Sequence, residues 1–299
     1  MSSYSSQATV NQLTNLLPSR ANIVEVGPRD GLQNEPPIPL EDKIQLINQL
    51  SQTGLKHIES GAFVSAQKVP QMADSDKVLQ QINRKAKVTY SALTPNQQGL
   101  EQAIAANANS VAIFTTVSET FCQRNINCSI TESLSRYQIV IELAKQHHIP
   151  VRGYLSCVID CPYEGKTAST RVAGLTKALL DMGCYEVSLG DTIGTGTPLS
   201  VARMLEAVMA KSPTGQIAVH FHDTYGQAIA NIYQALLMGI NTIDSSVAGL
   251  GGCPYAKGAT GNVATEKVLY LCEGLGIETG VNLSAVKQVS TFAQSITAR

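Results

Sequence analysis

The feature that most constrains the fold of this 299-residue chain is a repeated alternation of two kinds of segment. From about residue 22 onward, short β-branched or apolar runs alternate with longer stretches of helical periodicity. This alternation is typical of a parallel sheet whose strands are connected by helices. The predicted strands are residues 22–26, 57–60, 87–91, 110–114, 151–156, 186–189, 217–222 and 242–246, and the predicted helices include residues 40–52, 97–106, 131–148, 167–181, 199–211 and 228–238.

Eight strands in one chain of this length predict a closed (β/α)8 barrel, the TIM-barrel fold, rather than an open nucleotide-binding sheet. An open sheet of that kind has a glycine-rich phosphate turn after its first strand, whereas this chain reads GPRDGLQNE there. No linker interrupts the alternation. We therefore expect residues 22–299 to form a single domain with extra C-terminal helices, preceded by a leader or short helix over residues 1–21.

The composition disfavours several partners. Lys and Arg number 22 against 23 acidic residues, so the chain lacks the basic field on which nucleic acid or an anionic membrane depends. No run of about 18 apolar residues occurs, and the opening MSSYSSQATVNQL lacks the regions of a signal peptide. The seven cysteines are odd in number and scattered, which predicts a reducing, cytoplasmic environment without a disulfide framework.

Polar residues at the ends of predicted strands are the candidates for function, because active sites of such barrels lie at the carboxyl ends of the strands. These candidates are Arg29 and Asp30 after the first strand, Glu59 on the second, Asp191 after the sixth, His220 and His222 on the seventh, and the segment from Cys253 to Asn262 after the eighth.

The two strand-end histidines predict a metal site. His220 and His222 are separated by one residue, so their side chains point to the same face of a strand. Asp30 should lie close by, because the first strand of a closed ring adjoins the eighth and lies near the seventh. Together with the amide oxygen of Asn262, this set suits Mg²⁺ or Mn²⁺ better than a closed zinc site. The alternatives are two histidines satisfied at the barrel rim, and Asn262 as the N-cap of the following helix.

Arg29 and Glu59 form a second predicted unit. An arginine at a strand end can stabilise a developing oxyanion, and Glu59 can orient its guanidinium group. The alternatives are a surface ion pair between Arg29 and Asp30 and an ordinary salt bridge of Glu59 at the rim.

Residues 249–262, GLGGCPYAKGATGN, contain five glycines around Cys253. This composition predicts a mobile loop that closes over a site and excludes water from it. Cys253 would then deliver or remove a proton on closure, or else it is a buried small hydrophobic residue.

Six segments carry a family resemblance, namely EVGPRDGLQNE (residues 25–35), FVS and VPQMAD (within 63–74), RGYLSCVIDCPYEG (152–165), SLGDTIGTGTP (188–198), HFHDTYGQAIANI (220–232) and GLGGCPYAKGATGN (249–262). With these motifs the chain resembles the 3-hydroxy-3-methylglutaryl-CoA lyase family almost from end to end. The RDG and HxHD elements are shared with a wider group of barrel metallolyases and synthases, including isopropylmalate and homocitrate synthases. The glycine-rich loop is more discriminating.

The resemblance implies a (β/α)8 barrel that cleaves 3-hydroxy-3-methylglutaryl-CoA to acetoacetate and acetyl-CoA with a divalent cation, Mg²⁺ or Mn²⁺, as in leucine breakdown. It also implies a homodimer. By match to the family motifs, the metal ligands would be Asp30, His220, His222 and Asn262; the catalytic residues Arg29, Glu59 and the loop thiol Cys253, with Asp30 or His222 as the base; and the supporting residues Asp191 and Glu266.

The chain departs from the family pattern near Phe63, at Ser60, Gly61, Ala62 and Lys68. Smaller side chains next to Glu59 predict a larger acyl pocket, so a lyase for a longer 3-hydroxyacyl-CoA is one alternative. A related barrel synthase that condenses acyl-CoA esters is another. A non-catalytic protein that binds a metal or a CoA ester is a third alternative, although such a protein would be expected to have lost Arg29, Asp30 or Cys253.

Overall fold

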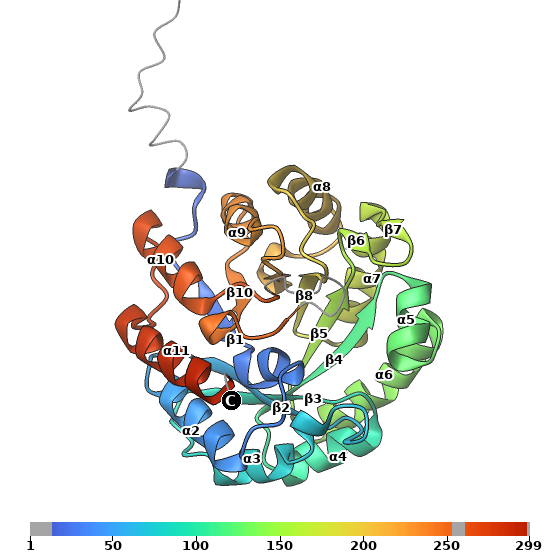
Figure 1. The fold of residues 1–299 in the computed structure, drawn as a ribbon. Helices are drawn as coiled ribbons and strands as arrows, with labels where there is room; N and C mark the ends of the chain where they lie inside the picture. Colours follow the sequence, from blue (N-terminus) through green and yellow to red (C-terminus); the bar gives the residue numbers. More distant parts are fainter. Residues whose placement is uncertain (1–13, 253–260, 298–299) are drawn as a thin grey trace, which may run out of the picture.

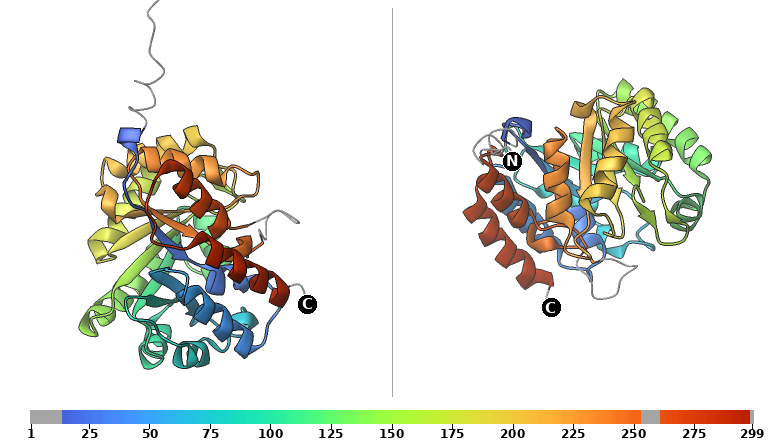
Figure 2. Two further views of the ribbon diagram at one scale, coloured as in Figure 1. Left: turned by 90° about the vertical axis from the view of Figure 1, so that its left-hand side faces the viewer. Right: turned by 90° about the horizontal axis from the view of Figure 1, so that it is seen from above.

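The computed structural model describes residues 14–252 and 261–297 (Figures 1 and 2). Parallel strands form a closed barrel in the order β1-β10-β9-β8-β5-β4-β3-β2, and a ring of helices surrounds it (Figure 1). The predicted (β/α)8 fold is therefore confirmed. The barrel strands are β1 (Asn22–Glu25), β2 (His57–Ala62), β3 (Thr89–Leu93), β4 (Ser110–Thr116), β5 (Val151–Ser156), β8 (Glu186–Asp191), β9 (Ile217–Phe221) and β10 (Thr242–Ser245).

Most helices lie where their periodicity predicts them, and the short elements are those that the sequence did not predict. Unpredicted elements include α3 (Ser75–Gln81), α5 (Glu119–Ile126), the hairpin of β6 (Asp160–Cys161) and β7 (Gly165–Lys166), and a π-helix, η1 (Gly27–Gly31). The α-helices are α2 (Leu40–Ser51), α3 (Ser75–Gln81), α4 (Gln97–Ala105), α5 (Glu119–Ile126), α6 (Ile130–Gln146), α7 (Ser169–Met182), α8 (Pro198–Met209), α9 (Ala228–Leu237), α10 (Thr265–Leu275) and α11 (Leu283–Thr297); the 3₁₀-helices are η2 (Pro70–Met72), η3 (Thr214–Gln216) and η4 (Val247–Gly249).

The two faces of the barrel strands differ in chemistry. Apolar residues such as Ile113, Leu155 and Val219 belong to one continuous hydrophobic core with the helices. The alternate positions carry buried polar residues, among them Arg152 on β5 and Asp244 on β10. These two strands are not neighbours in the barrel, so the ion pair between them crosses its interior. The inside of the barrel is therefore polar, in contrast to the branched apolar side chains that usually fill it.

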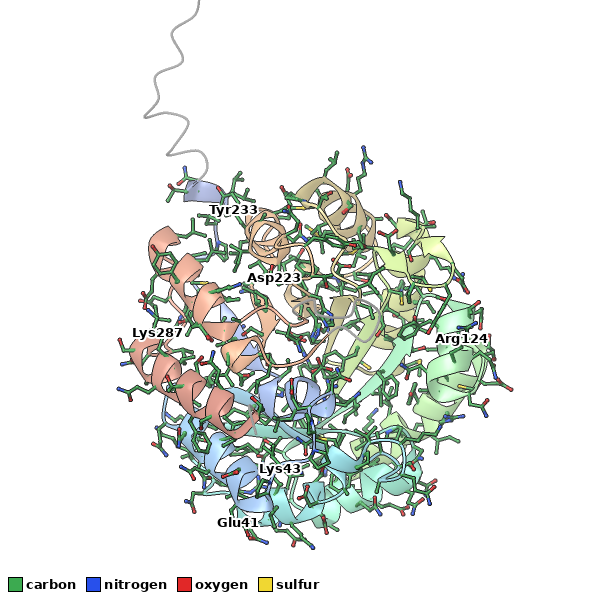
Figure 3. The ribbon with its side chains drawn as sticks, in the orientation of Figure 1. Glu41, Lys43, Arg124, Asp223, Tyr233 and Lys287 are labelled. Atoms are coloured by element: carbon green, nitrogen blue, oxygen red, sulfur yellow. The ribbon has the colours of Figure 1, made fainter. Side chains whose placement is uncertain are left out.

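The outer surface of the helical ring carries charged side chains. Figure 3 shows Glu41, Arg124 and Lys287 on the rim of the molecule, where all three are exposed. Within the described ranges, no helix combines the length and the apolar character needed to span a bilayer.

The extra C-terminal helix α11 packs beside α2 (Figure 2). The chain leaves α2 through Gly54, which has a φ of +101° and lies against the carbonyl oxygen of Gly280. A Cβ at Gly54 would overlap that oxygen, so only glycine fits at this contact.

We predict that Gly54→Ala destabilises the protein by about 2 kcal/mol or more, because the left-handed conformation and the steric overlap both oppose a side chain. The matched control is Gly174→Ala on α7, where a Cβ would meet nothing within 4 Å. Alanine there should stabilise the protein by about 0.5–1 kcal/mol, since it favours the helix. Urea unfolding of both variants measures the difference, and equal free energies of unfolding would contradict the argument.

Candidate metal centre and active site

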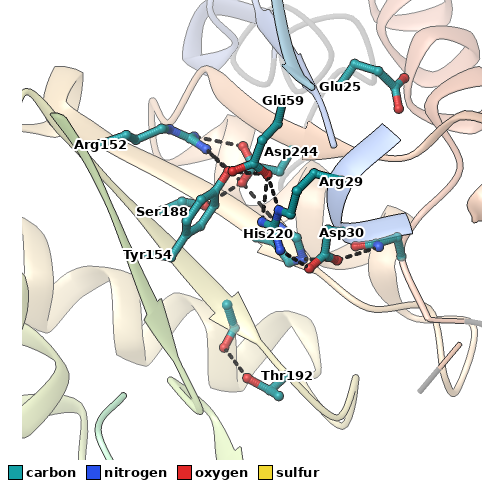
Figure 4. A network of polar contacts seen from close by, with 12 residues as sticks. Glu25, Arg29, Asp30, Glu59, Arg152, Tyr154, Ser188, Thr192, His220 and Asp244 are labelled. Atoms are coloured by element: carbon teal, nitrogen blue, oxygen red, sulfur yellow. Dashed lines mark hydrogen bonds and ion pairs between the residues drawn. The ribbon is translucent and has the colours of Figure 1, made fainter. Parts of the chain in front are cut away.

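Asp30, His220 and His222 meet at the carboxyl ends of the strands, as the sequence predicts. One potential ligand atom from each lies within 4.8 Å of the others. Asp30 belongs to η1, directly after β1, while His220 lies on β9 and His222 follows that strand. The Nε2 atom of His220 is 3.8 Å from Oδ2 of Asp30 (Figure 4). The ring order β1-β10-β9 brings these residues together.

Two of the three groups in this cluster, His222 and Asp30, favour the protonation state that binds a divalent cation. The pKa of His220 is shifted the other way, because burial would lower it but is outweighed by the hydrogen bond to Asp244 and the charge of Asp30, which raise it. Burial lowers the pKa of His222 to about 4, helped by the charge of His220, and its Nδ1 has no partner among the described atoms. Burial alone would raise the pKa of Asp30, but Arg29 and the two histidines outweigh it and lower that pKa to about 2. A neutral imidazole and an ionised carboxylate are the forms in which such groups bind metal ions.

Asn262 joins the cluster through its amide nitrogen. Nδ2 donates to Oδ2 of Asp30 at 2.8 Å and to the carbonyl of Leu250 at 3.2 Å. Ligation of a metal through the amide oxygen requires the amide to turn over, which exchanges two atoms of similar size. The alternative role of Asn262 as the N-cap of the following helix is wrong. The N-cap residue of α10 is Ala264, and no side chain caps this helix through a hydrogen bond.

Arg29 is held between two carboxylates. Its Nε and Nη2 atoms lie 2.7 Å and 2.6 Å from Oε2 of Glu59, and Nη1 lies 2.6 Å from Oδ1 of Asp30. Only 7% of the arginine side chain is exposed, so the alternative of a surface ion pair is wrong. Burial opposes the charge of Arg29, but the two carboxylates outweigh it and raise its pKa. Arg29 is therefore a permanent cation beside the metal cluster.

A connected set of buried groups, which we call the interior network, extends from this site into the barrel (Figure 4). Arg152 pairs with both oxygens of Asp244, at 3.0 Å and 2.7 Å, and Asp244 contacts Nδ1 of His220 at 3.2 Å. On the other side, Tyr154 donates to Oε2 of Glu59 at 3.2 Å. The network comprises Arg29, Asp30, Glu59, Arg152, Tyr154, Glu186, Ser188, His220 and Asp244.

The charges of the interior network do not balance. Its two guanidinium groups face four carboxyl groups, those of Asp30, Glu59, Glu186 and Asp244. When all are ionised, the carboxylates outnumber the guanidinium groups by two in a buried region, which is costly. Burial raises the pKa of Glu59, and the hydrogen bond to Asp244 and the charge of Asp30 outweigh burial and raise the pKa of His220, so protons can offset part of this excess. A divalent cation on Asp30, His220 and His222 would offset this excess as well. The donor set and the charge of its surroundings thus both fit Mg²⁺ or Mn²⁺.

Asp191 and Glu266 support neighbouring turns. Asp191 ends β8, accepts from the Gly196 amide at 2.8 Å, and has its pKa raised to about 6 by burial. Glu266 on α10 accepts from the Ala248 amide at 3.1 Å, which fixes η4. None of the hydrogen bonds described for these two residues reaches Asp30, His220 or His222.

Cys253 lies outside the described residues, as does most of the glycine-rich loop. The described start of this loop approaches the site closely. Gly251 has a φ of +106°, and a Cβ there would come 2.8 Å from Nδ2 of Asn262. A glycine is required at this position.

Sequence reasoning missed the deeper residues of the network, Arg152, Tyr154, Glu186, Ser188 and Asp244. A signal for two of them was present, since Arg152 and Asp244 are charged residues inside predicted strands. Charged residues are seldom fully buried unless they are paired, so two of opposite sign within barrel strands favour a pair.

Glu25, also missed, links the two turns that flank the site. Its Oε1 accepts from the amides of Gly27 and Val247, both at 2.8 Å, and its Oε2 accepts from the Thr265 hydroxyl at 2.7 Å. Through these bonds one carboxyl group fixes η1, which carries Arg29 and Asp30, to η4 and α10. Burial raises the pKa of Glu25 to about 7.

Fold and site together define a (β/α)8-barrel protein with a candidate divalent-metal centre at the carboxyl ends of its strands. Residues 20–293 match the model of the HMGL-like family, and the chain belongs to that family.

Curated relatives and solved structures agree with the family. The chain is 57% identical over 277 residues to "3-hydroxy-3-methylglutaryl-CoA lyase, cytoplasmic" of Mus musculus. The aligned region covers 92% of this chain and 81% of that protein. It is 57% identical over 271 residues to "3-hydroxy-3-isohexenylglutaryl-CoA/hydroxy-methylglutaryl-CoA lyase" of Pseudomonas aeruginosa, covering 90% of each. The crystal structure of a hydroxymethylglutaryl-CoA lyase from Pseudomonas aeruginosa superposes with a TM-score of 0.93 at 54% identity, covering 95% of both chains.

We predict that Glu25 makes stability fall as the pH rises. Its folded pKa is about 7 against 4.5 for the free group, so the folded state retains a proton that the unfolded state loses between these values. This contribution is fully present below pH 4.5 and is lost as the pH rises through about 7. Its size is on the order of 3 kcal/mol. Urea unfolding across this range should show a steeper loss for the wild type than for Glu25→Gln; parallel pH profiles would refute the assignment.

Proposed function

We propose that this chain is a divalent-metal-dependent lyase that cleaves (S)-3-hydroxy-3-methylglutaryl-CoA to acetoacetate and acetyl-CoA by retro-Claisen cleavage of a carbon–carbon bond. The observation that carries the proposal is the buried Arg29, which contacts Asp30 of the metal cluster and is locked by Glu59. The family membership and the lyase names of the relatives support the same reaction.

Asp30, His220, His222 and Asn262 would hold the cation. When bound, a divalent cation supplies Lewis-acid polarisation of substrate oxygens and lowers the pKa of a coordinated hydroxyl group. Asp30 or His222 removes the proton of the substrate hydroxyl, since both lie in this cluster.

Loss of the hydroxyl proton starts the cleavage. The oxygen forms the ketone of acetoacetate as the carbon–carbon bond breaks, and the electron pair of that bond passes to the thioester carbonyl as an enolate. Arg29 has five N–H groups, and its contacts with Glu59 and Asp30 leave two for the enolate oxygen. Cys253, or an acid of the metal site, returns a proton to the enolate carbon to complete acetyl-CoA.

The structure removes one basis for the longer-chain alternative. Gly61 packs on α3, because a Cβ there would come 2.7 Å from Oγ of Ser75, and the Ala62 amide donates to the same atom at 3.0 Å. The absence of a side chain at Gly61 therefore serves strand–helix packing. Since the name of the Pseudomonas aeruginosa relative includes an isohexenyl ester, a longer ester still belongs in the assay.

The cellular setting completes the proposal. We place the enzyme in leucine catabolism in the cytoplasm, with residues 22–299 as one catalytic domain that forms a homodimer and binds an acyl-CoA. The relatives include proteins named cytoplasmic and proteins named mitochondrial.

The deciding experiment measures acetoacetate release from 3-hydroxy-3-methylglutaryl-CoA with Mg²⁺, with Mn²⁺ and with EDTA. We expect release with either ion and loss of activity in EDTA, because the substrate oxygens then lack their electrophile. Absence of release under all conditions would overturn the substrate assignment, and turnover of a longer 3-hydroxyacyl-CoA in the same assay would replace it.

We predict that Arg29→Gln lowers kcat by about 100- to 1000-fold, because the enolate loses its cationic partner. Exposed Arg20, paired only with exposed Glu278 in the described structure, offers the matched control. Arg20→Gln should keep kcat within about twofold of wild type. Equal kcat values for the two variants would remove Arg29 from the mechanism.

We predict that Asp30→Asn weakens Mn²⁺ binding by more than the roughly 10–100-fold that loss of an outer hydrogen-bond partner costs. Calorimetric titration of the metal-free protein measures this without substrate. Asp76→Asn, on the exposed face of α3, is the control and should bind Mn²⁺ as the wild type does. Unchanged affinity in Asp30→Asn would exclude it as a ligand.

A further inference from the structure

Asp244 is a fully buried carboxylate in the interior network that touches a candidate metal ligand. Oδ2 lies 3.2 Å from Nδ1 of His220, and it also accepts from the Ser188 hydroxyl at 2.8 Å. Arg152 spans both carboxylate oxygens. Asp244 therefore accepts hydrogen bonds from three different side chains and is remote from solvent.

The orientation of Asp244 is fixed from across the barrel. Arg152 is itself anchored, since its Nε donates to Oε1 of Glu186 at 2.7 Å and its Nη1 donates to the Tyr154 hydroxyl at 3.0 Å. A bidentate arginine pair holds a carboxylate in one plane. Rotation of Asp244 would break both of its bonds to Arg152, so the oxygen facing His220 stays in place.

This geometry determines which nitrogen of His220 carries the proton. An ionised carboxylate only accepts hydrogen bonds, so Nδ1 of His220 must be the N–H donor. The lone pair of the neutral ring then lies on Nε2, the nitrogen that faces Oδ2 of Asp30 at 3.8 Å. His222 has no such partner among the described groups, because its Nδ1 is buried and unpaired there.

We propose that Asp244, oriented by Arg152, is a positioning residue that holds His220 in the Nδ1–H tautomer and so presents Nε2 to the metal ion. The inference deepens the proposed function and rests on its metal site. Asp244 touches neither substrate nor ion; it acts through the imidazole ring, as outer carboxylates do in other metal sites.

The test compares two carboxylates that bind the same arginine. In Asp244→Asn one carboxylate oxygen becomes an NH₂ group. This group would face a hydrogen-bond donor, either the guanidinium group of Arg152 or Nδ1–H of His220, and so one of these two hydrogen bonds is lost. We expect Mn²⁺ binding to the metal-free protein to weaken about 10–100-fold. Glu186→Gln removes the same charge on the far side of Arg152 and leaves Asp244 intact, so it controls for the lost charge. Its Mn²⁺ affinity should fall clearly less than that of Asp244→Asn.

A second readout reports the tautomer directly and needs neither metal nor activity. ¹⁵N spectra of histidine rings in the metal-free wild type, at a pH where the rings are neutral and with His220→Gln for assignment, should show Nδ1 of His220 protonated and Nε2 free. Asp244→Asn should shift this population toward Nε2–H. The wild-type measurement does not depend on whether the variant folds.

Several results would overturn the proposal. They are an Nε2–H tautomer of His220 in the wild type, a folded Asp244→Asn with Mn²⁺ affinity within about threefold of wild type, and equal losses in Asp244→Asn and Glu186→Gln. A wild type that binds no Mn²⁺ would overturn the metal site along with this inference. Failure of the lyase assay alone, with Mn²⁺ affinity and tautomer as expected, would overturn only the substrate and leave Asp244 as proposed.

Discussion

The ion pair between Arg152 and Asp244 is the constraint on which the interior of this barrel depends. It joins β5 to β10 across the barrel and lies where other barrels have layers of branched apolar side chains. Burying two charges costs more free energy than their attraction returns unless the remaining hydrogen-bonding groups are also satisfied. Here Glu186, Tyr154, Ser188 and His220 satisfy them, so each of these side chains is held in place by the pair. The hydrophobic core of the protein lies outside the barrel interior, in the apolar layer between strands and helices.

Much of the site followed from the sequence because it depends on the order and the period of the strands. Alternation placed His220 and His222 on one face, and ring closure brought Asp30 to them. The adjacency of the first two strands in the ring brought Arg29 to Glu59. Contacts across the interior of the barrel did not follow, since they depend on strand tilt and side-chain length. Arg152 and Asp244 could therefore each be recognised as charged residues inside predicted strands, while the geometry of the bond between them could not be derived from spacing.

The π-helix η1 escaped sequence reasoning for a different reason. GPRDG reads as a turn, and the wider π geometry appears only when the surrounding structure satisfies the backbone. π-turns of this kind often mark functional sites. Glu25 provides part of that support, because it accepts from the Gly27 amide inside η1 and from the Val247 amide in η4. Gly31 allows the two turns to approach, since a Cβ there would come 2.8 Å from Leu250. A single buried carboxyl group thus positions Arg29 and Asp30 against the start of the glycine-rich loop.

The charge of the interior network connects the fold to its proposed chemistry. The four carboxyl groups of the network outnumber its two guanidinium groups, and two of them, Asp30 and Asp244, contact His220. A cation bound there would stabilise the folded state by the same attraction that holds it in the site, because the unfolded chain has no such cluster. Arg29 would then face a cation on one side and Glu59 on the other. The two N–H groups that Glu59 and Asp30 do not engage would then be available to the developing enolate beside the cation.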